Sequence, residues 1–293
     1  MIGAIEAGGT KFVVALAAPD GSVIERARIA TTTPDGTFAA VRSFFDRASA
    51  EHGALTSIGI ASFGPIELSP ASADYGTITS TPKPGWTGAS FVTALRDYGV
   101  PLTIATDVEG AALAEATLGA GRGLETVAYT TVGTGIGSAI VRNGQPVRGF
   151  THMESGHTQP PHDRSRDPYS GLCPYHGDCL EGLASGPAIA ARWGNPLSEV
   201  GDPAAIDLIA SYLSHLAATL ILLHAPDRLI FGGGVMDTPG LIEAMRVHTQ
   251  ERVAGYVAHP RLDDGLKDYI AAPGLGSDSG LTGAILLGRG ALS

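Results

Sequence analysis

The sequence IGAIEAGGTKFVVALAA, residues 2–18, reads as two β-strands joined by a tight turn rich in glycine. Alternating apolar positions and β-branched side chains favour strands on both sides of that turn. Gly8 and Gly9 permit a positive φ and let backbone N–H groups approach an anion. Thr10 and Lys11 add a hydroxyl group and a positive charge at the same point. The stretch therefore indicates either a phosphate-binding turn or a simple hairpin.

A second stretch, VAYTTVGTGIGSAIV (residues 127–141), repeats this pattern of strand, glycine-rich turn and strand. Two such hairpins that face a shared cleft would suit a phosphate clamp, because each turn offers backbone N–H donors. No helix is expected directly after the second turn, so it is not a Walker A loop. Its donors would come from Gly133, Thr134, Gly135 and Gly137.

Strands and helices alternate along the chain, which predicts an α/β protein. Helical spacing covers residues 38–51, and the buried strand SIGIAS follows at residues 57–62. The strand LTIAT, residues 102–106, ends at Asp107, and a helix is expected over residues 108–118. A carboxylate there would lie at the carboxyl edge of a sheet, where α/β proteins bind ligands. Asp107 could also be a plain helix N-cap, which the local sequence taken alone favours.

The C-terminal half continues the α/β pattern. Residues 204–224 read as a long apolar helix, and a closing helix at residues 279–292 could pack back on the first lobe. Between them, RLIFGGGV (residues 228–235) predicts a strand followed by a tight turn. A glycine triplet there would let a flat group lie against the backbone, or would serve the turn alone. The triplet consists of Gly232, Gly233 and Gly234.

The only two cysteines lie in the segment THMESGHTQPPHDRSRDPYSGLCPYHGDCLEGLASGP, residues 151–187. Cys173 and Cys179 bracket His176 with two residues in each gap, and His157 lies upstream. Thiolate and imidazole are the usual zinc ligands, and four of them make a closed tetrahedral site. Because the segment is rich in Gly, Pro, Asp and Ser, a metal could supply stability that hydrophobic burial does not. Free thiols and a strained disulfide are the alternatives.

The composition argues against several classes of partner. The 293 residues carry a net charge of -10 without a Lys- or Arg-rich run, so no attraction for nucleic acid or anionic membranes is expected. The first residues show no signal-peptide pattern, and the apolar run at residues 216–223 is too short to span a bilayer. We therefore expect a cytoplasmic, globular protein without a membrane partner.

Five motifs, in their order along the chain, resemble those of the ROK family of bacterial sugar kinases, and most closely those of its fructokinases. EAGGTK (6–11) and TVGTGIG (131–137) resemble the two phosphate motifs of the family. HMESGH (152–157) contains the Glu-x-Gly-His of the family, and GLCPYHGDCLEGLASGPAI (171–189) is similar to the zinc segment of the fructokinases. LIFGGGV (229–235) resembles the adenosine motif, so the resemblance covers essentially the full chain.

The resemblance implies the actin-like ATPase fold, which is ribonuclease H-like. In that fold two α/β lobes, each with a mixed sheet, close over a central cleft. We expect the small lobe at residues 1–108 plus 279–293, and the large lobe at residues 109–278. The family also suggests a homodimer.

The implied reaction is transfer of the γ-phosphoryl group of ATP to the 6-hydroxyl group of a hexose, foremost D-fructose. Asp107 would be the base that accepts the hydroxyl proton, and Mg²⁺ would bridge phosphates held by the two glycine turns. The glycine triplet would bind adenosine. By the same resemblance a structural Zn²⁺ would be held by His157, Cys173, His176 and Cys179. The sugar-binding residues would be Glu154, Glu181, His157 and Glu109.

One position departs from the family, whose members typically carry Asp-x-Asn where this chain has Asp107-Val108-Glu109. An ionised Glu accepts but does not donate hydrogen bonds, and a second carboxylate near Asp107 could raise the pKa of the base. A glucokinase, mannokinase or N-acetylhexosamine kinase is therefore an alternative. A sugar-sensing regulator, which would carry a DNA-binding helix-turn-helix, and a non-catalytic actin-like ATPase, which would lack a zinc loop, are remoter alternatives.

Overall fold

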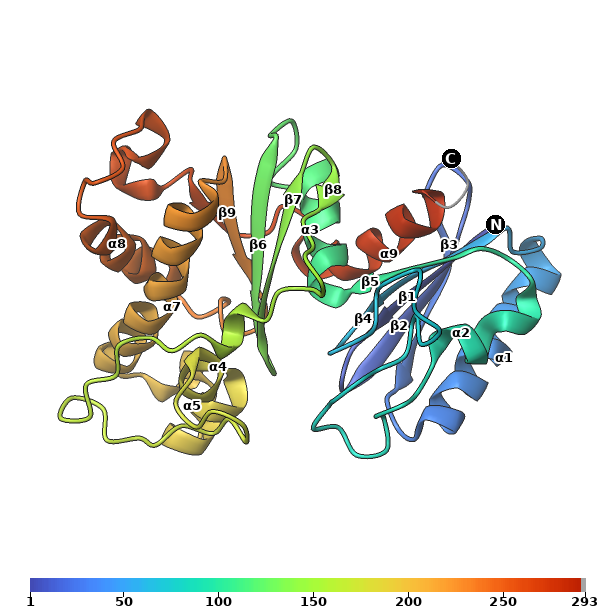
Figure 1. Ribbon diagram of the computed structural model, residues 1–293, viewed down its shortest axis with the longest axis horizontal. Helices are drawn as coiled ribbons and strands as arrows, with labels where there is room; N and C mark the ends of the chain where they lie inside the picture. Colours follow the sequence, from blue (N-terminus) through green and yellow to red (C-terminus); the bar gives the residue numbers. More distant parts are fainter. Residues whose placement is uncertain (291–293) are drawn as a thin grey trace. The chain divides into compact units, whose positions relative to one another are not determined.

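The computed structural model describes residues 1–290 and divides into two compact units, each built on a five-stranded sheet (Figure 1). Unit 1 comprises Met1–Ala114, Pro146–His152 and the described residues from 277 to 290, and unit 2 comprises Glu115–Gln145 and Met153–Gly276. Each sheet contains parallel and antiparallel pairs. The α/β class, with two mixed sheets as in the actin-like ATPase fold, is thus confirmed.

The units differ in their bounds from the lobes expected at residues 1–108 and 109–278. The first division falls at Ala114, because α3 (Asp107–Thr117) continues from the sheet of unit 1 as one helix. Pro146–His152 belongs to unit 1, although the residues on either side of it belong to unit 2. We call Pro146–His152 the crossing strap.

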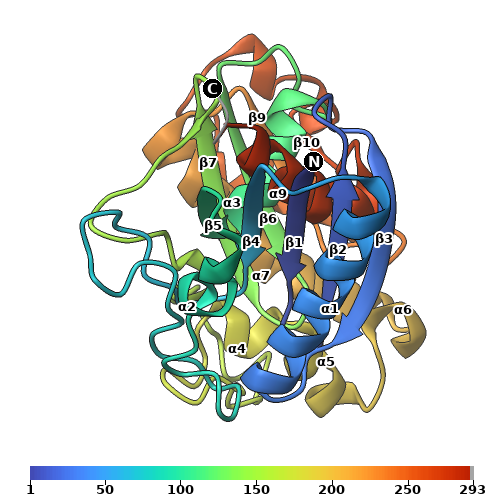
Figure 2. The same ribbon diagram turned by 90° about the vertical axis from the view of Figure 1, so that its right-hand side faces the viewer.

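The sheet of unit 1 has the strand order β3-β2-β1-β4-β5 (Figure 2). β2 is antiparallel to β1 and β3, whereas β1, β4 and β5 are parallel, so these three strands end at the same edge. The strands are β1 (Ile2–Ala7), β2 (Lys11–Ala17), β3 (Val23–Ala30), β4 (Ser57–Ser62) and β5 (Leu102–Thr106). The helices are α1 (Pro34–His52), α2 (Phe91–Leu95), η1 (Arg96–Tyr98), the start of α3, and α9 (Ser279–Gly290).

Buried side chains line both faces of this sheet. Phe38 of α1 and Phe12 of β2 belong to a cluster of aromatic and aliphatic residues on one face. Leu281 of α9 belongs to a second cluster, made largely of alanines, on the other face. Because successive residues of a strand point to opposite faces, β1 contributes Ile5 to the first cluster and Ala4 to the second.

β4 and α9 approach each other closely at Gly59. A Cβ atom at this position would collide with the backbone of Ala284 and Gly288. Only glycine allows the helix to lie this near the strand. The alanines around Gly59 have short side chains, so they let the helix lie close to the sheet along the whole face. α9 is therefore an integral layer of unit 1.

The sheet of unit 2 has the order β10-β9-β6-β7-β8. As in unit 1, an antiparallel hairpin lies beside parallel strands. The strands are β6 (Thr126–Val132), β7 (Ile136–Arg142), β8 (Gln145–Pro146), β9 (Arg228–Gly232) and β10 (Ile270–Ala271). The helices are η2 (Ser155–His157), α4 (Leu180–Ala184), α5 (Gly186–Trp193), α6 (Leu197–Val200), α7 (Pro203–His224), α8 (Leu241–Val253), η3 (Pro260–Leu262), η4 (Asp264–Leu266) and η5 (Gly276–Asp278), the last at the unit boundary.

α7 is the one helix within residues 1–290 that is long and apolar enough to cross a membrane. The run at residues 216–223, expected to be too short for this, is part of that longer helix. However, 56% of its most apolar stretch is buried inside the protein, and α7 packs along α8. A helix that is apolar on most of its sides is typically buried in the core of a protein, and this fits α7.

Candidate functional site

The carboxyl ends of parallel strands bring the candidate residues of unit 1 to one edge of its sheet. The turn at residues 8–11 follows β1, and Asp107 follows β5 directly. Within the turn, the Gly8 N–H donates to the Lys11 carbonyl oxygen at 3.0 Å, while Gly9 and Thr10 are exposed. An exposed glycine turn and a carboxylate thus share the edge at which parallel sheets bind ligands.

Asp107 is the first residue of α3, and the N-cap is Thr106. Thr106 Oγ1 accepts the Glu109 N–H at 3.1 Å, and Glu109 Oε2 accepts the Thr106 N–H at 3.0 Å. This reciprocal arrangement is a capping box of the pattern Thr-x-x-Glu. Asp107 Oδ1 accepts the N–H of Val108 at 2.9 Å, at the helix end where negative charge is favourable. The alternative of Asp107 as a plain N-cap is therefore wrong.

Glu109 is engaged within unit 1 through both of its carboxylate oxygens. Its side chain is 5% exposed, and Arg148 of the crossing strap donates to the two oxygens at 2.7 and 2.8 Å. One of these oxygens also accepts the Thr106 N–H. Both oxygens of this nearly buried side chain are thus engaged by protein donors, and its expected contact with a sugar stays a prediction. Arg148 is a residue that no sequence motif contained.

Glu6, the first residue of the EAGGTK motif, is a further candidate for which no role was expected. It is the second-to-last residue of β1, two residues before Gly8. Burial, followed by the charge of Asp107, raises the pKa of Glu6 to about 7. The sequence signal is an acidic residue at the end of an otherwise apolar strand. Ionisable side chains with a strongly shifted pKa, close to another charged group, are common at functional sites.

The pKa of Glu6 predicts a pH-dependent stability that Glu6→Gln should lack. Between about pH 4.5 and about pH 7 the folded state keeps a proton that the unfolded state has released, so the free energy of unfolding falls as the pH rises. The full effect is roughly 3 kcal/mol. Melting temperatures at about pH 5 and about pH 8 should show Glu6→Gln gaining stability over wild type only at the higher pH.

The exposed Glu243→Gln on α8 is the matched control for this measurement and should show the same difference from wild type at both pH values. A Glu6→Gln variant that behaves like this control would contradict the prediction.

In unit 2 the second glycine turn and the glycine triplet lie at one edge of the sheet. The turn follows β6 and the triplet begins at the end of β9, and these strands are parallel with Thr131 opposite Gly232. The Val235 N–H donates to the Val132 carbonyl oxygen at 3.0 Å. Gly233 has a φ of 92°, and a Cβ there would lie 2.5 Å from the same oxygen. The close approach of the two segments therefore requires glycine at this position.

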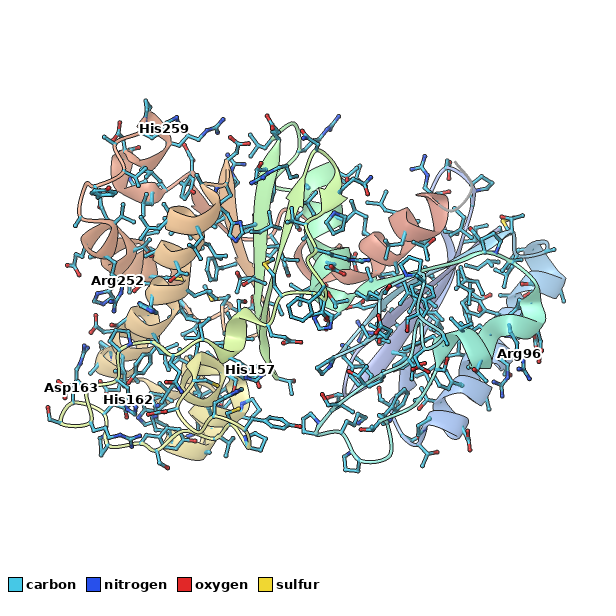
Figure 3. The ribbon with its side chains drawn as sticks, in the orientation of Figure 1. Arg96, His157, His162, Asp163, Arg252 and His259 are labelled. Atoms are coloured by element: carbon cyan, nitrogen blue, oxygen red, sulfur yellow. The ribbon has the colours of Figure 1, made fainter. Side chains whose placement is uncertain are left out.

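The four expected metal ligands come together in unit 2, with ligand atoms within 4.8 Å of one another. Cys173 Sγ lies 3.7 Å from Nδ1 of both His157 and His176, and Cys179 Sγ lies 3.6 Å from Nδ1 of His157. Of these ligands, His157 is labelled in Figure 3. Zinc–sulfur bonds of about 2.3 Å and zinc–nitrogen bonds of about 2.05 Å at tetrahedral angles give a sulfur–nitrogen separation of about 3.6 Å. The four side chains therefore fit a tetrahedral zinc ion.

The local backbone explains how Cys173, His176 and Cys179, which are close in sequence, can turn their side chains toward one ion. Cys173 and Gly177 exchange both of their backbone hydrogen bonds, at 2.9 and 3.1 Å, which folds the segment between them back on itself. Both cysteines are buried free thiols, so the disulfide alternative is excluded. Burial raises the pKa of the Cys179 thiol to about 11, and a bound cation would be needed to hold it as a thiolate.

The metal-ligand segment contacts the second glycine turn through Glu181 and Gly156. Glu181 Oε2 accepts the N–H of Ile136 at 2.9 Å, and a Cβ on Gly135 would lie 2.8 Å from the same oxygen. A Cβ on Gly156 would collide with the Ile136 carbonyl oxygen, so glycine lets the segment lie against β7. Glu154 precedes η2, whose last residue is the ligand His157. The ligand cluster, Glu154 and Glu181 thus belong to one connected structure.

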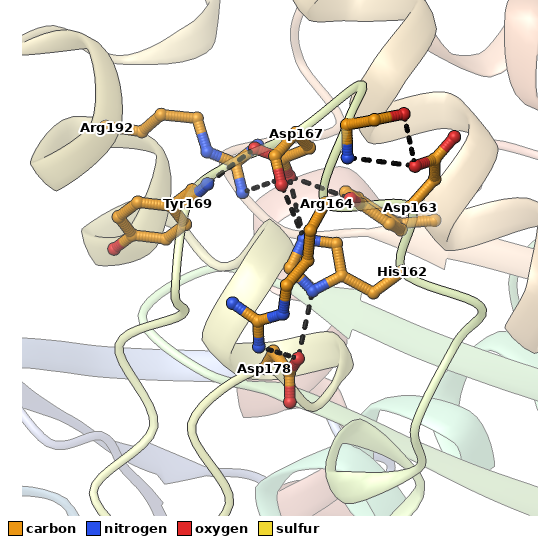
Figure 4. A network of polar contacts seen from close by, with 9 residues as sticks. His162, Asp163, Arg164, Asp167, Tyr169, Asp178 and Arg192 are labelled. Atoms are coloured by element: carbon orange, nitrogen blue, oxygen red, sulfur yellow. Dashed lines mark hydrogen bonds and ion pairs between the residues drawn. The ribbon is translucent and has the colours of Figure 1, made fainter.

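A network of polar contacts fixes the loop that precedes Cys173 (Figure 4). His162 Nδ1 lies 2.9 Å from Asp178 Oδ2, and Arg164 donates to the same oxygen at 2.7 Å. The buried Asp167 pairs with Arg192 of α5 at 3.0 Å. These pairs connect the loop to α5 and to the segment that carries the cysteines.

A second group of possible metal ligands, Glu25, Glu51 and His52, lies on unit 1. Arg47 already binds both carboxylate oxygens of Glu25, and Glu51 is exposed. Exposed acidic residues with their own cation do not form a closed metal site. The group serves below as a control.

Three comparisons with known proteins cover both units. The sequence model of the ROK family matches residues 2–290. The chain is 41% identical over 294 residues to the putative fructokinase of Bacillus subtilis strain 168, covering 100% of this chain and 96% of that protein. It is 43% identical over 292 residues to the fructokinase of Zymomonas mobilis subsp. mobilis, covering 97% and 95%. The ROK hexokinase of Thermus thermophilus superposes with a TM-score of 0.78 at 26% identity, covering 99% of this chain and 98% of that one.

Proposed function

Because the chain belongs to the ROK family, we propose that it transfers the γ-phosphoryl group of ATP to the 6-hydroxyl group of D-fructose. Two relatives of nearly equal length, at 41% and 43% identity, bear the name fructokinase and support this substrate. The observation that carries the proposal is the position of Asp107, at the same sheet edge as the exposed turn at residues 8–11. Phosphoryl transfer to a hydroxyl group requires a base beside a phosphate-binding turn.

In the proposed step, the oxygen of the 6-hydroxyl group forms the new bond to the γ-phosphorus. The bond from this phosphorus to the β–γ bridging oxygen breaks, and its electron pair leaves with ADP. Asp107 takes the hydroxyl proton. Mg²⁺ that accompanies ATP would neutralise charge on the phosphates. A carboxylate is a sufficient base, because this chemistry depends mainly on positioning and on charge neutralisation.

The two glycine turns are proposed to bind the phosphate oxygens through backbone N–H groups, hydroxyl groups and the ammonium group of Lys11. The glycine triplet after β9 would receive the adenosine, where its backbone lies against the end of β6. The phosphate-binding residues would be Gly8, Gly9, Thr10, Lys11, Gly133, Thr134, Gly135 and Gly137.

We propose further that the Cys/His cluster binds one Zn²⁺. Four protein ligands leave no open position, so the ion would stabilise the segment and would not activate water. Nδ1 of His157 faces the sulfur atoms, which leaves its Nε2–H to donate to a sugar hydroxyl group. Carboxylates that would accept hydrogen bonds from the sugar are Glu154 and Glu181.

A coupled assay that measures ADP formation tests the acceptor. Fructose should give the highest kcat/KM among fructose, glucose, mannose and N-acetylmannosamine. A clear preference for another sugar of this set would replace fructose as the substrate but keep the kinase, whereas no ADP formation with any of them would refute the proposed reaction. The position of the new phosphate is checked by NMR of the product.

We also propose a cytoplasmic homodimer. The acidic sequence without basic runs and the burial of α7 in unit 2 support a water-soluble protein. Light scattering should give twice the chain mass of 29.9 kDa, and a mass equal to that of one chain would contradict the dimer.

A further inference from the structure

The crossing strap is attached to unit 1 by two side chains of its own. Arg148 donates from Nε and Nη2 to the two oxygens of Glu109, at 2.7 and 2.8 Å. His152 Nε2 accepts the N–H of Ile66 at 3.3 Å. The contact of Arg148 is bidentate, which is the geometry in which a guanidinium group binds a carboxylate most strongly.

Glu109 requires a cation because of where it lies. Its side chain is only 5% exposed, and it follows Asp107 by two residues at the start of α3. Two carboxylates thus share the first turn of α3, and a buried carboxylate without a partner is strongly unfavourable. Arg148 is the side chain that compensates the charge of Glu109.

The same carboxylate fixes the geometry of the first turn of α3. Glu109 Oε2 accepts hydrogen bonds from Arg148 Nη2 and from the N–H of Thr106. In return, Thr106 Oγ1 accepts the N–H of Glu109. Asp107 lies between these two capping residues in the chain. Its orientation therefore depends on a box that closes only while the Glu109 side chain is held in this rotamer.

We propose that Arg148 is a positioning residue for phosphoryl transfer, which holds Glu109 in the capping box and thereby orients the Asp107 carboxylate toward the acceptor hydroxyl group. The inference rests on the proposed function, in which Asp107 is the base. It assigns Glu109 to the support of that base and not to the sugar. Where family members typically carry Asn, this chain thus has a glutamate, and Arg148 neutralises its charge.

A double-mutant cycle tests the proposal with Arg148→Gln, Glu109→Gln and the double variant. Arg148→Gln should lower kcat by about 100-fold, because a displacement of about 1 Å at a catalytic group has effects of this size, while KM for ATP stays within about twofold. Arg148→Lys should restore part of the loss, since lysine supplies the charge without the bidentate contact. The double variant should come within about 10-fold of wild type, because it leaves no unpaired charge.

Arg47→Gln is the matched control. Arg47 also binds both oxygens of a glutamate of unit 1, Glu25, but at the surface, so kcat should stay within about twofold of wild type. The proposal is wrong if Arg148→Gln keeps kcat within about threefold of wild type, or if the double variant loses as much as the two single variants combined. A rise in KM for ATP that accounts for the whole effect would likewise overturn it in favour of a purely structural role.

The wild-type measurement separates this inference from the proposed function. If wild-type protein phosphorylates none of the four sugars, the proposed function is wrong, and the positioning role is wrong with it. If wild type phosphorylates one of them and Arg148→Gln does so equally well, only the positioning role is wrong.

Discussion

Replacing Asp107 by Asn is expected to lower kcat for fructose phosphorylation by about 1,000-fold, within the range of about 10²–10⁴ that a general base contributes. Asparagine keeps the shape of the side chain and can still accept the N–H of Val108, so the start of α3 should not change. It cannot take the hydroxyl proton. KM for ATP should change by less than about twofold, because the glycine turn, not Asp107, would bind the phosphates.

The measurement combines steady-state kinetics with calorimetric titration of ATP. Asp97→Asn is the matched control, since Asp97 is an exposed aspartate of the same unit, in η1, and its kinetics should equal those of wild type. A loss of only a few-fold in the Asp107→Asn variant would show that another group accepts the proton. Glu6, which lies close to Asp107, would then be the first candidate.

Replacing Cys179 by Ala should release the metal and destabilise unit 2. Cys179 is fully buried, and its sulfur lies 3.6 Å from Nδ1 of His157, so alanine removes one of four ligands without a substitute. Zinc content should fall from one ion per chain to near zero. The loss of a structural site costs several kcal/mol, which corresponds to a fall in melting temperature of about 10 °C or more. Activity should fall as well, since the same segment places Glu181 against the second glycine turn.

Elemental analysis and differential scanning fluorimetry check this result, and prolonged dialysis of wild type against a strong chelator should reproduce the variant. His52→Gln is the control, because His52 belongs to the exposed group of possible ligands on unit 1. Its zinc content and melting temperature should match those of wild type. Wild-type protein that is fully active and equally stable without metal would refute the zinc site.

Elements with a strong local pattern could be predicted well from the sequence. The strands expected at residues 57–62 and 102–106 have those bounds in the structure. α1 begins at Pro34 and not at residue 38, because its start is set by the Thr33 cap and not by apolar spacing. α4 was not expected at all, since five residues that follow a metal ligand carry no helical period. The closing helix extends to Gly290, and residues 291 and 292 of its expected range lie outside the described residues.

The candidate site was predictable where its residues are close in sequence. The spacing of Cys173, His176 and Cys179 is fixed by the chain, so the pattern itself implies that they can share an ion. Arg148 and Glu109 are 39 residues apart, and only the fold brings them together. The Thr-x-x-Glu pattern at the start of α3 is the one local signal that indicates a capping role for Glu109.

The place of α9 has a consequence for how the protein is made on the ribosome. The strands of unit 1 are complete once Thr106 has been synthesised, but the helix that covers their alanine-rich face starts at Ser279. The delay spans roughly 170 residues, which takes about 10–30 s at typical synthesis rates. During this time the face around Gly59 has no partner helix, so we expect chaperones to bind the nascent chain at this stage and truncation before α9 to leave unit 1 prone to aggregation.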